Sequence, residues 1–111
     1  MDSKQKTWLL DIKNSIDEIF QFVEDTQNFE SFSKDLKTRK AVERNLEIIG
    51  EAVNRIEKYD DSVKIENSKR IIGTRNRIIH SYDNISIEII WAIVKRELPN
   101  LNSEILKYLE K

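Results

Sequence analysis

Residues 42–56 of the chain read VERNLEIIGEAVNRI, and this stretch decides the fold class. Its apolar residues recur every three or four positions, which is typical of one face of an amphipathic α-helix. They are Val42, Leu46, Ile49, Val53 and Ile56. Gly50 lies inside this helix, where glycine costs about 1 kcal/mol relative to alanine. A glycine at such a place indicates that another backbone approaches closely, unless it is a neutral accident.

Similar apolar stripes extend the helical pattern to most of the chain. We expect helices over about residues 4–25, 37–59, 67–82 and 86–98, a short helical turn within residues 26–40, and a last short helix over residues 101–109. Pro99 should end or kink the helix before it. A chain with two glycines and one proline has few turn residues for a sheet. The sequence therefore predicts an all-α fold, an antiparallel four-helix bundle with an additional short C-terminal helix, formed by residues 1–111 as one domain.

Composition excludes several classes of protein. The 19 basic and 20 acidic residues nearly cancel, which argues against coating of nucleic acid by bulk charge. Residues 64–82 are nevertheless locally basic, with five basic side chains and one acidic one. The chain has no cysteine, which rules out disulfides, cysteine-based zinc sites and a thiol nucleophile.

Location and cofactors are predicted from the same composition. No apolar run approaches the roughly 20 residues of a membrane span, and the first residues do not resemble a signal peptide. We expect a cytoplasmic protein that contacts no membrane, with no metal site and no cofactor.

The residues with chemical potential lie between Arg75 and Tyr82. On a helical wheel, Arg75 falls in the middle of an apolar face formed by isoleucines, while Asn76 and His80 lie side by side on its flank. A guanidinium in such a position must be paired, or must line a cleft or an interface.

Two interpretations of Arg75 follow from the residues alone. In the structural one, Arg75 bonds a carboxylate of the preceding helix, such as Glu47 or Glu51. In the functional one, Arg75 binds a phosphodiester and His80 exchanges a proton with it. Those two groups are what an endoribonuclease needs when the 2′-hydroxyl of its substrate is the nucleophile.

Two motifs resemble those of a known family. Residues 75–82, RNRIIHSY, resemble the Arg-x4-His-x-Tyr motif of the HepT-like branch of the HEPN superfamily. Residues 41–52, AVERNLEIIGEA, are similar to the second signature of that family, centred on Ile-Gly-Glu-Ala. Residues 71–73, Trp91 and the Leu98-Pro99-x-Leu101 segment also resemble the family, so the likeness covers most of the chain.

The resemblance implies a function and a role for each motif residue. HepT-like proteins are small all-α toxins of toxin–antitoxin pairs that cleave RNA without a metal, as homodimers whose motif helices face each other across a cleft. Carried over, Arg75 would bind the scissile phosphate, His80 would act as acid or base or orient the phosphate, and Asn76 would hold that geometry. Tyr82 would lie in the cleft and be the residue that an MntA-type minimal nucleotidyltransferase antitoxin modifies with AMP. Glu47 and Glu51 would support the site.

Other functions remain open at this point. The chain could be a non-catalytic helical partner subunit of a nucleotidyltransferase that binds nucleotide or substrate. It could also be a plain structural bundle, in which Arg75 pairs internally and His80 is incidental. The adjacent isoleucine pairs at 48–49, 71–72, 78–79 and 89–90 either create a second contact surface, as a homodimer needs, or each bridge two neighbours within one bundle.

Overall fold

The fold is known from a computed structural model that describes residues 2–80 and 86–110. Its helices are α1 (Ser3–Phe22), α2 (Phe29–Lys34), α3 (Leu36–Tyr59), α4 (Ser68–His80), α5 (Ile87–Ala92), the π-helical η1 (Ile93–Glu97) and α6 (Leu98–Leu109). The described residues contain no strand, so the predicted all-α fold is confirmed. Tyr82 lies outside the described residues.

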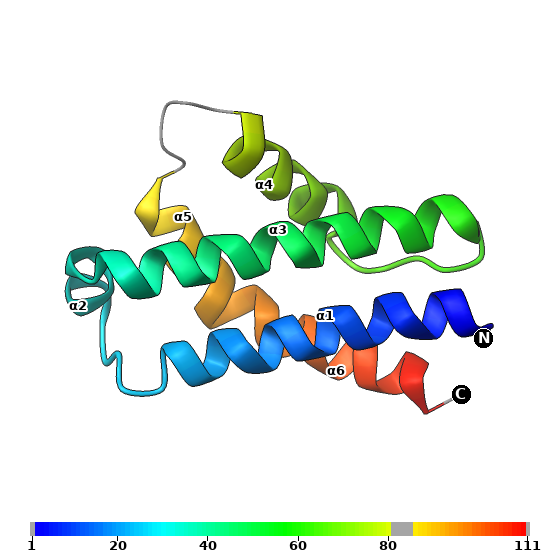
Figure 1. Cartoon of the computed structure of the whole chain (residues 1–111), viewed down its shortest axis with the longest axis horizontal. Coiled ribbons are helices and arrows are strands. Elements are labelled where there is room, and N and C mark those ends of the chain that lie inside the picture. Colours follow the sequence, from blue (N-terminus) through cyan, green and yellow to red (C-terminus); the bar gives the residue numbers. More distant parts are fainter. Residues whose placement is uncertain (1, 81–85, 111) are drawn as a thin grey trace.

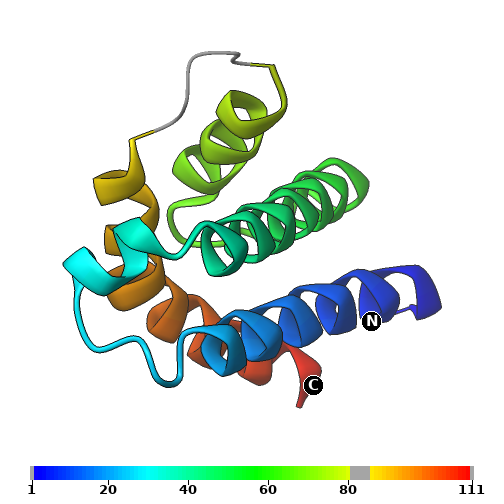
Figure 2. The same cartoon turned by 60° about the vertical axis from the view of Figure 1, so that its left-hand side comes forward.

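Helix α3 is the central element of the bundle (Figure 1). Helix α1 runs antiparallel along one side of it, and α4 packs on the other side, away from α1 (Figures 1 and 2). The last helical segments pass behind both, where α5 contacts α2 and α6 contacts α1. Because α1 and α4 flank α3, a strip of the α3 surface lies between them.

The hydrophobic core lies between α1, α3 and the C-terminal helices. All five residues of the predicted α3 stripe are buried, as are four residues of α1: Leu9, Ile12, Ile16 and Ile19. Phe32 of α2 is fully buried and stacks on Trp91 with ring centroids 4.9 Å apart, which closes one end of the core. Fully burying an aliphatic side chain contributes roughly 1.5–3 kcal/mol, so this core stabilises the bundle.

Short polar side chains define where the helices begin. Asp2, Asn28 and Asp35 accept hydrogen bonds from backbone N–H groups in the first turns of α1, α2 and α3, respectively. The Thr38 hydroxyl and backbone N–H both donate to the Asp35 carboxylate, and these bonds lower the pKa of Asp35. The break between α2 and α3 therefore has a local cause in the sequence.

The C-terminal part differs from the expectation of two helices separated at Pro99. The chain stays helical from Ile87 to Leu109, and η1 is the π-helical segment directly before the proline. Proline has no N–H to donate to the carbonyl four residues earlier, and a π segment accommodates such an interruption without ending the helix. The Asn100 side chain donates to the Arg96 carbonyl at 3.4 Å, which supports the last turn of η1.

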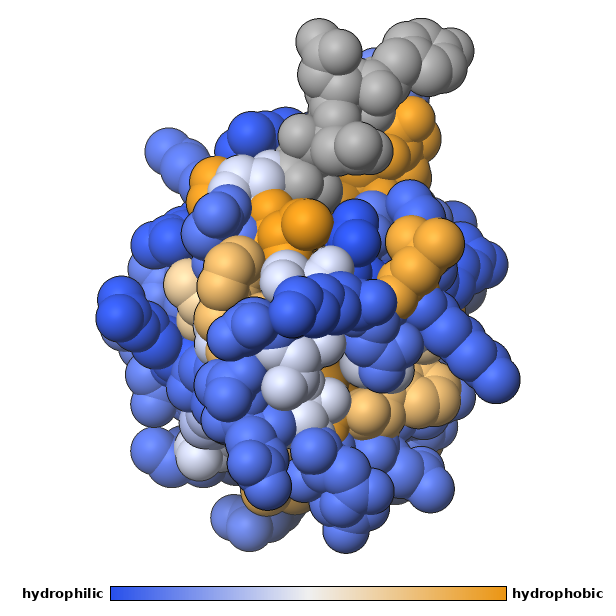
Figure 3. Space-filling view, turned by 90° about the vertical axis from the view of Figure 1, so that its left-hand side faces the viewer, coloured by the Kyte–Doolittle hydropathy of each residue, from blue (hydrophilic) through white to orange (hydrophobic). Residues whose placement is uncertain are grey.

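The surface is mainly hydrophilic. Figure 3 shows the end of the molecule at which α2 lies, where hydrophobic side chains form only small patches among hydrophilic ones. Among the described residues, no helix combines the length and the apolar character needed to cross a membrane.

Helix α4 lies very close to α3 at Gly50. A Cβ atom built on Gly50 would lie 2.3 Å from the Cβ of Arg75 and 2.9 Å from its Cγ. These distances are far shorter than real carbon contacts, so only glycine permits this packing. The prediction that Gly50 admits a close neighbour is confirmed, and the neighbour is the arginine of the motif.

Replacing Gly50 with alanine should therefore destabilise the fold. Overpacking typically costs 1–3 kcal/mol, and alanine regains about 1 kcal/mol in helix propensity. We expect Gly50→Ala to lower the free energy of unfolding by up to about 2 kcal/mol, measured by urea denaturation.

Gly73 supplies the matched control for this substitution. It lies in α4, and a Cβ atom there would meet nothing within 4 Å. Gly73→Ala should raise the free energy of unfolding by about 0.5–1 kcal/mol. Equal effects of the two substitutions would contradict the close approach at Gly50.

Candidate functional site

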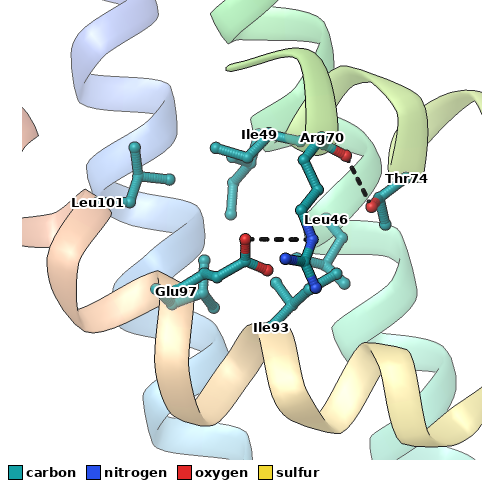
Figure 4. A pocket seen from close by; sticks show the side chains of 9 residues that line it. Leu46, Ile49, Arg70, Thr74, Ile93, Glu97 and Leu101 are labelled. Atoms are coloured by element: carbon teal, nitrogen blue, oxygen red, sulfur yellow. Dashed lines mark hydrogen bonds and ion pairs between the residues drawn. The ribbon is translucent and has the colours of Figure 1, made fainter. Parts of the chain in front are cut away.

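Residues of α3 and η1 contact the first half of α4, the helix that carries the Arg-x4-His motif, and hold it in position. Figure 4 shows a small cavity, about 10 Å3 in volume, where Leu46 and Ile49 of α3 face Ile93 of η1. Arg70 of α4 closes it, with Nε 3.3 Å from Oε1 of Glu97. A space of this size hardly holds one water molecule, so α3, α4 and η1 are tightly packed here.

The α3-facing side of α4 also carries Thr74, the only buried residue of this helix. The Thr74 hydroxyl donates to the Arg70 carbonyl at 2.9 Å, so this polar side chain is satisfied within its own helix. Of the described helices, only α3 makes an extensive contact with α4, which leaves the opposite face of α4 open.

Arg75 lies on the α3 side of α4, where the wheel placed it. Its Cβ and Cγ pass over Gly50, and the guanidinium emerges beside Glu51. Nη2 of Arg75 is 2.8 Å from Oε2 of Glu51, and Nη1 donates to Oδ1 of Asn76 at 2.8 Å. Arg75, Asn76 and Glu51 thus form one connected group, and three of the predicted site residues are brought together.

The predicted pairing of Arg75 with a carboxylate is correct for Glu51 but not for Glu47. Glu47 instead lies 3.1 Å from Nη1 of Arg44, on its own helix. The Arg75–Glu51 pair is not sealed in the protein, because the Arg75 side chain is 25% exposed and that of Glu51 is 35% exposed. The Nε–H of Arg75 is buried and has no acceptor among the described residues, so the guanidinium is only partly satisfied.

His80 is the last residue of α4 and is exposed. It forms no hydrogen bond or ion pair with another described residue, so its ring is available to a ligand or to another molecule. On an ideal helix, His80 is rotated by about 140° from Arg75, toward the open face of α4. Within one copy of the protein, the side chains of Arg75 and His80 therefore point in different directions.

A groove runs along α3 between α1 and α4, with Arg75 at its side. Its volume is about 250 Å3, and it is lined by Trp8, Asp11, Arg44, Glu47, Ile48, Glu51, Ala52, Arg55, Arg75 and Ile79. Sequence reasoning did not single out Trp8, Arg44 or Arg55. The groove residues of α3 lie at positions 44, 47, 48, 51 and 55, a helical spacing that the sequence shows. The sequence does not show that α1 and α4 form the walls of the groove.

The described part of the chain contains no evident metal-binding site. No group of three or more His, Asp or Glu side chains in residues 2–80 and 86–110 is arranged to hold a metal ion.

Comparison with known proteins identifies the family of the chain. The family model described as "Ribonuclease HepT-like" matches residues 12–108, which include both motifs. A protein of Methanocaldococcus jannaschii named "Putative RNase MJ0127" is 40% identical over 90% of this chain and 83% of its own length. "Probable ribonuclease HepT" of Thermococcus cleftensis is 34% identical over 96% of this chain and 97% of its own.

No solved structure matches the chain significantly. The expectation of a ribonuclease is confirmed by the family match and by these relatives. With nearly the whole chain covered and the Arg-x4-His motif on one ordered helix, the protein belongs to the ribonuclease HepT-like family.

Proposed function

We propose that this protein is a metal-independent endoribonuclease toxin of a toxin–antitoxin pair, acting as a homodimer in the cytoplasm. The observation that carries the proposal is the position of Arg75, whose partly exposed guanidinium is held at the side of a groove by Glu51 and Asn76. A cation kept at the surface in a fixed orientation suits the binding of a phosphodiester.

The reaction needs an anion-binding group and a proton carrier. Arg75 would bind the scissile phosphate and stabilise the negative charge that develops on its oxygens. The 2′-oxygen attacks phosphorus as its proton is removed, and the bond from phosphorus to the 5′-oxygen breaks as that oxygen gains a proton. His80 exchanges one of these protons, leaving a cyclic phosphate on one fragment and a 5′-hydroxyl on the other.

A second copy of the chain would complete the site. Arg75 faces α3 while His80 faces the open side of α4, so the two groups of one chain diverge. If the motif helices of two copies face each other, the arginine of one copy can meet the histidine of the other. Ile79, which is 42% exposed on the same helix, supplies apolar surface for such a contact.

Glu51 and Asn76 act in this proposal as positioning residues for Arg75. Each binds one terminal nitrogen of the guanidinium, at 2.8 Å in both cases, and this leaves further N–H donors for substrate. Glu47 would act only indirectly, through the charge it places next to Arg44.

Regulation would act on Tyr82, two residues after the end of α4. We propose that an MntA-type minimal nucleotidyltransferase is the antitoxin, and that it transfers AMP from ATP to the Tyr82 hydroxyl with release of pyrophosphate. The added bulk and negative charge would then occupy the position that the RNA phosphate requires.

The substitution Arg75→Met distinguishes a catalytic role of Arg75 from a structural one. Arg75→Met keeps the Cβ and Cγ atoms that pass over Gly50 and removes the guanidinium with its charge and its N–H donors. Because the ion pair with Glu51 is partly exposed, we expect the free energy of unfolding to fall by at most about 1 kcal/mol. RNA cleavage in buffer with a chelator should fall by at least about 100-fold. A variant that unfolds would favour a structural role for Arg75, and a folded variant that still cleaves RNA would show that Arg75 is not catalytic.

A mixing experiment tests the shared site. Arg75→Met and His80→Ala should each be inactive, but random pairing of the two gives dimers with one intact site. We expect the mixture to regain about a quarter of wild-type cleavage. A mixture as inactive as its components would show that each site uses one chain only.

Growth of a bacterial host tests both the toxicity of the chain and its neutralisation by the antitoxin. Expression alone should stop growth, and co-expression with an MntA-type nucleotidyltransferase as antitoxin should restore it. Tyr82→Phe lacks the modified hydroxyl, so the partner should no longer relieve the arrest. Harmless expression of the wild-type chain, with no RNA cleavage in vitro, would instead support a non-catalytic partner subunit.

A further inference from the structure

The groove between α1 and α4 is larger than a single phosphate requires. Arg44 and Arg55 lie at its two ends along α3, 11 residues apart and thus about 16 Å apart along the helix axis. Arg75 enters from the side, next to Glu51. Three guanidiniums therefore line one continuous depression, and two of them have no part in the proposed chemistry.

The charges in the groove are arranged in pairs. Arg44 is 3.1 Å from Glu47, and Nε of Arg55 is 2.9 Å from Oε1 of Glu51. Each contact uses one nitrogen of a guanidinium that carries five N–H donors. The side chains of Arg44 and Arg55 are 71% and 58% exposed, so their remaining donors face solvent.

Trp8 forms part of the opposite wall and is held in a fixed orientation. Its ring meets that of Tyr59 edge to face, with centroids 5.4 Å apart. Tyr59 in turn donates its hydroxyl to Asp2, which raises the pKa of Tyr59, and Gln5 donates to Asp60 at 2.9 Å. These contacts join the start of α1 to the end of α3, so Trp8 is a rigid aromatic surface.

We infer that this groove binds the single-stranded RNA segment next to the cleaved phosphate, with Arg44 and Arg55 on backbone phosphates and Trp8 stacked on an unpaired base. The inference rests on the proposed function and extends it from the scissile bond to its neighbours. Cationic side chains along a groove, together with an aromatic ring, are the combination that binds single strands without reading their sequence. Asp11, Glu47 and Glu51 balance the three arginines, so the lining has no formal net charge, which fits a site with moderate affinity that must release its product.

The inference is tested by binding, separately from cleavage. The His80→Ala chain keeps the whole groove, and fluorescence anisotropy with a labelled oligouridylate measures its affinity. In this background, Arg55→Glu should weaken binding by about tenfold, and Arg55→Ala should reduce the slope of log affinity against log salt by about 0.7. Glu47→Gln removes a negative charge from the groove and should tighten binding about two- to threefold.

Lys34→Glu is the matched control for Arg55→Glu. Lys34 also pairs with a glutamate four residues away, at 2.9 Å, but it lies on α2 and not in the groove. Both substitutions change the net charge by the same amount, so Lys34→Glu should weaken binding by less than about twofold.

Substitutions of Trp8 test the stacked base. Trp8→Ala should weaken binding by about fivefold or more, and Trp8→Phe should recover most of the affinity because it retains a ring. Circular dichroism and urea denaturation check that both variants are folded.

The outcomes distinguish this inference from the proposed nuclease. If the wild-type chain cleaves RNA but Arg55→Glu and Trp8→Ala bind as Lys34→Glu does, the groove inference is wrong and the nuclease stands. If the groove variants lose binding as expected but the wild-type chain does not cleave RNA, the groove is confirmed and the nuclease is wrong. Absence of RNA binding by the His80→Ala chain would overturn the groove inference.

Discussion

The site depends on the contact between Gly50 of α3 and Arg75 of α4. Because Gly50 has no side chain, the aliphatic part of Arg75 can lie directly on the α3 backbone. The guanidinium then reaches Glu51, the next residue along α3, instead of being displaced outward. With α4 set at this distance and rotation, Thr74 is buried and His80 faces the open side of the helix. The absence of a methyl group at Gly50 thus determines where the Arg75 side chain lies.

The Arg75–Glu51 pair orients the guanidinium more than it stabilises the fold. Both side chains are partly in water, and ion pairs of this kind contribute at most about 1 kcal/mol. A fully buried pair would have tied Arg75 to a structural role, since exposing it to a phosphate would break the interior. Partial exposure, a second contact with Asn76 and an unsatisfied Nε–H instead leave the cation fixed in position and still able to bind an anion.

Much of the fold and part of the site could be predicted from the sequence because they depend on local pattern. The apolar stripe of α3, the start of α4 after a loop, the close neighbour of Gly50 and the inward position of Arg75 all follow from helical periodicity. It could not be predicted that Arg75 pairs with Glu51 and not with Glu47. The two glutamates lie one turn apart on α3, and only the position of α4 along the α3 axis decides which of them Arg75 reaches.

The remaining differences have tertiary causes. Helix periodicity does not show whether a proline ends a helix or follows a π-helical segment, so the continuity of α5, η1 and α6 was missed. The groove was missed because Trp8 and Arg75 are 67 positions apart and meet only when α1 and α4 flank α3. The role of Tyr82 remains a prediction, since the residue lies outside the described part of the chain.

The central claim is that the Arg75 guanidinium contacts RNA, and its own side-chain NMR signals test this most directly. A 15N-labelled His80→Ala chain is titrated with a 2′-O-methylated oligonucleotide, and the Arg75 Nε–H signal is assigned from its loss in Arg75→Met. We expect this signal to shift and to saturate together with those of groove residues. A signal that stays unchanged while the oligonucleotide binds elsewhere would contradict the account.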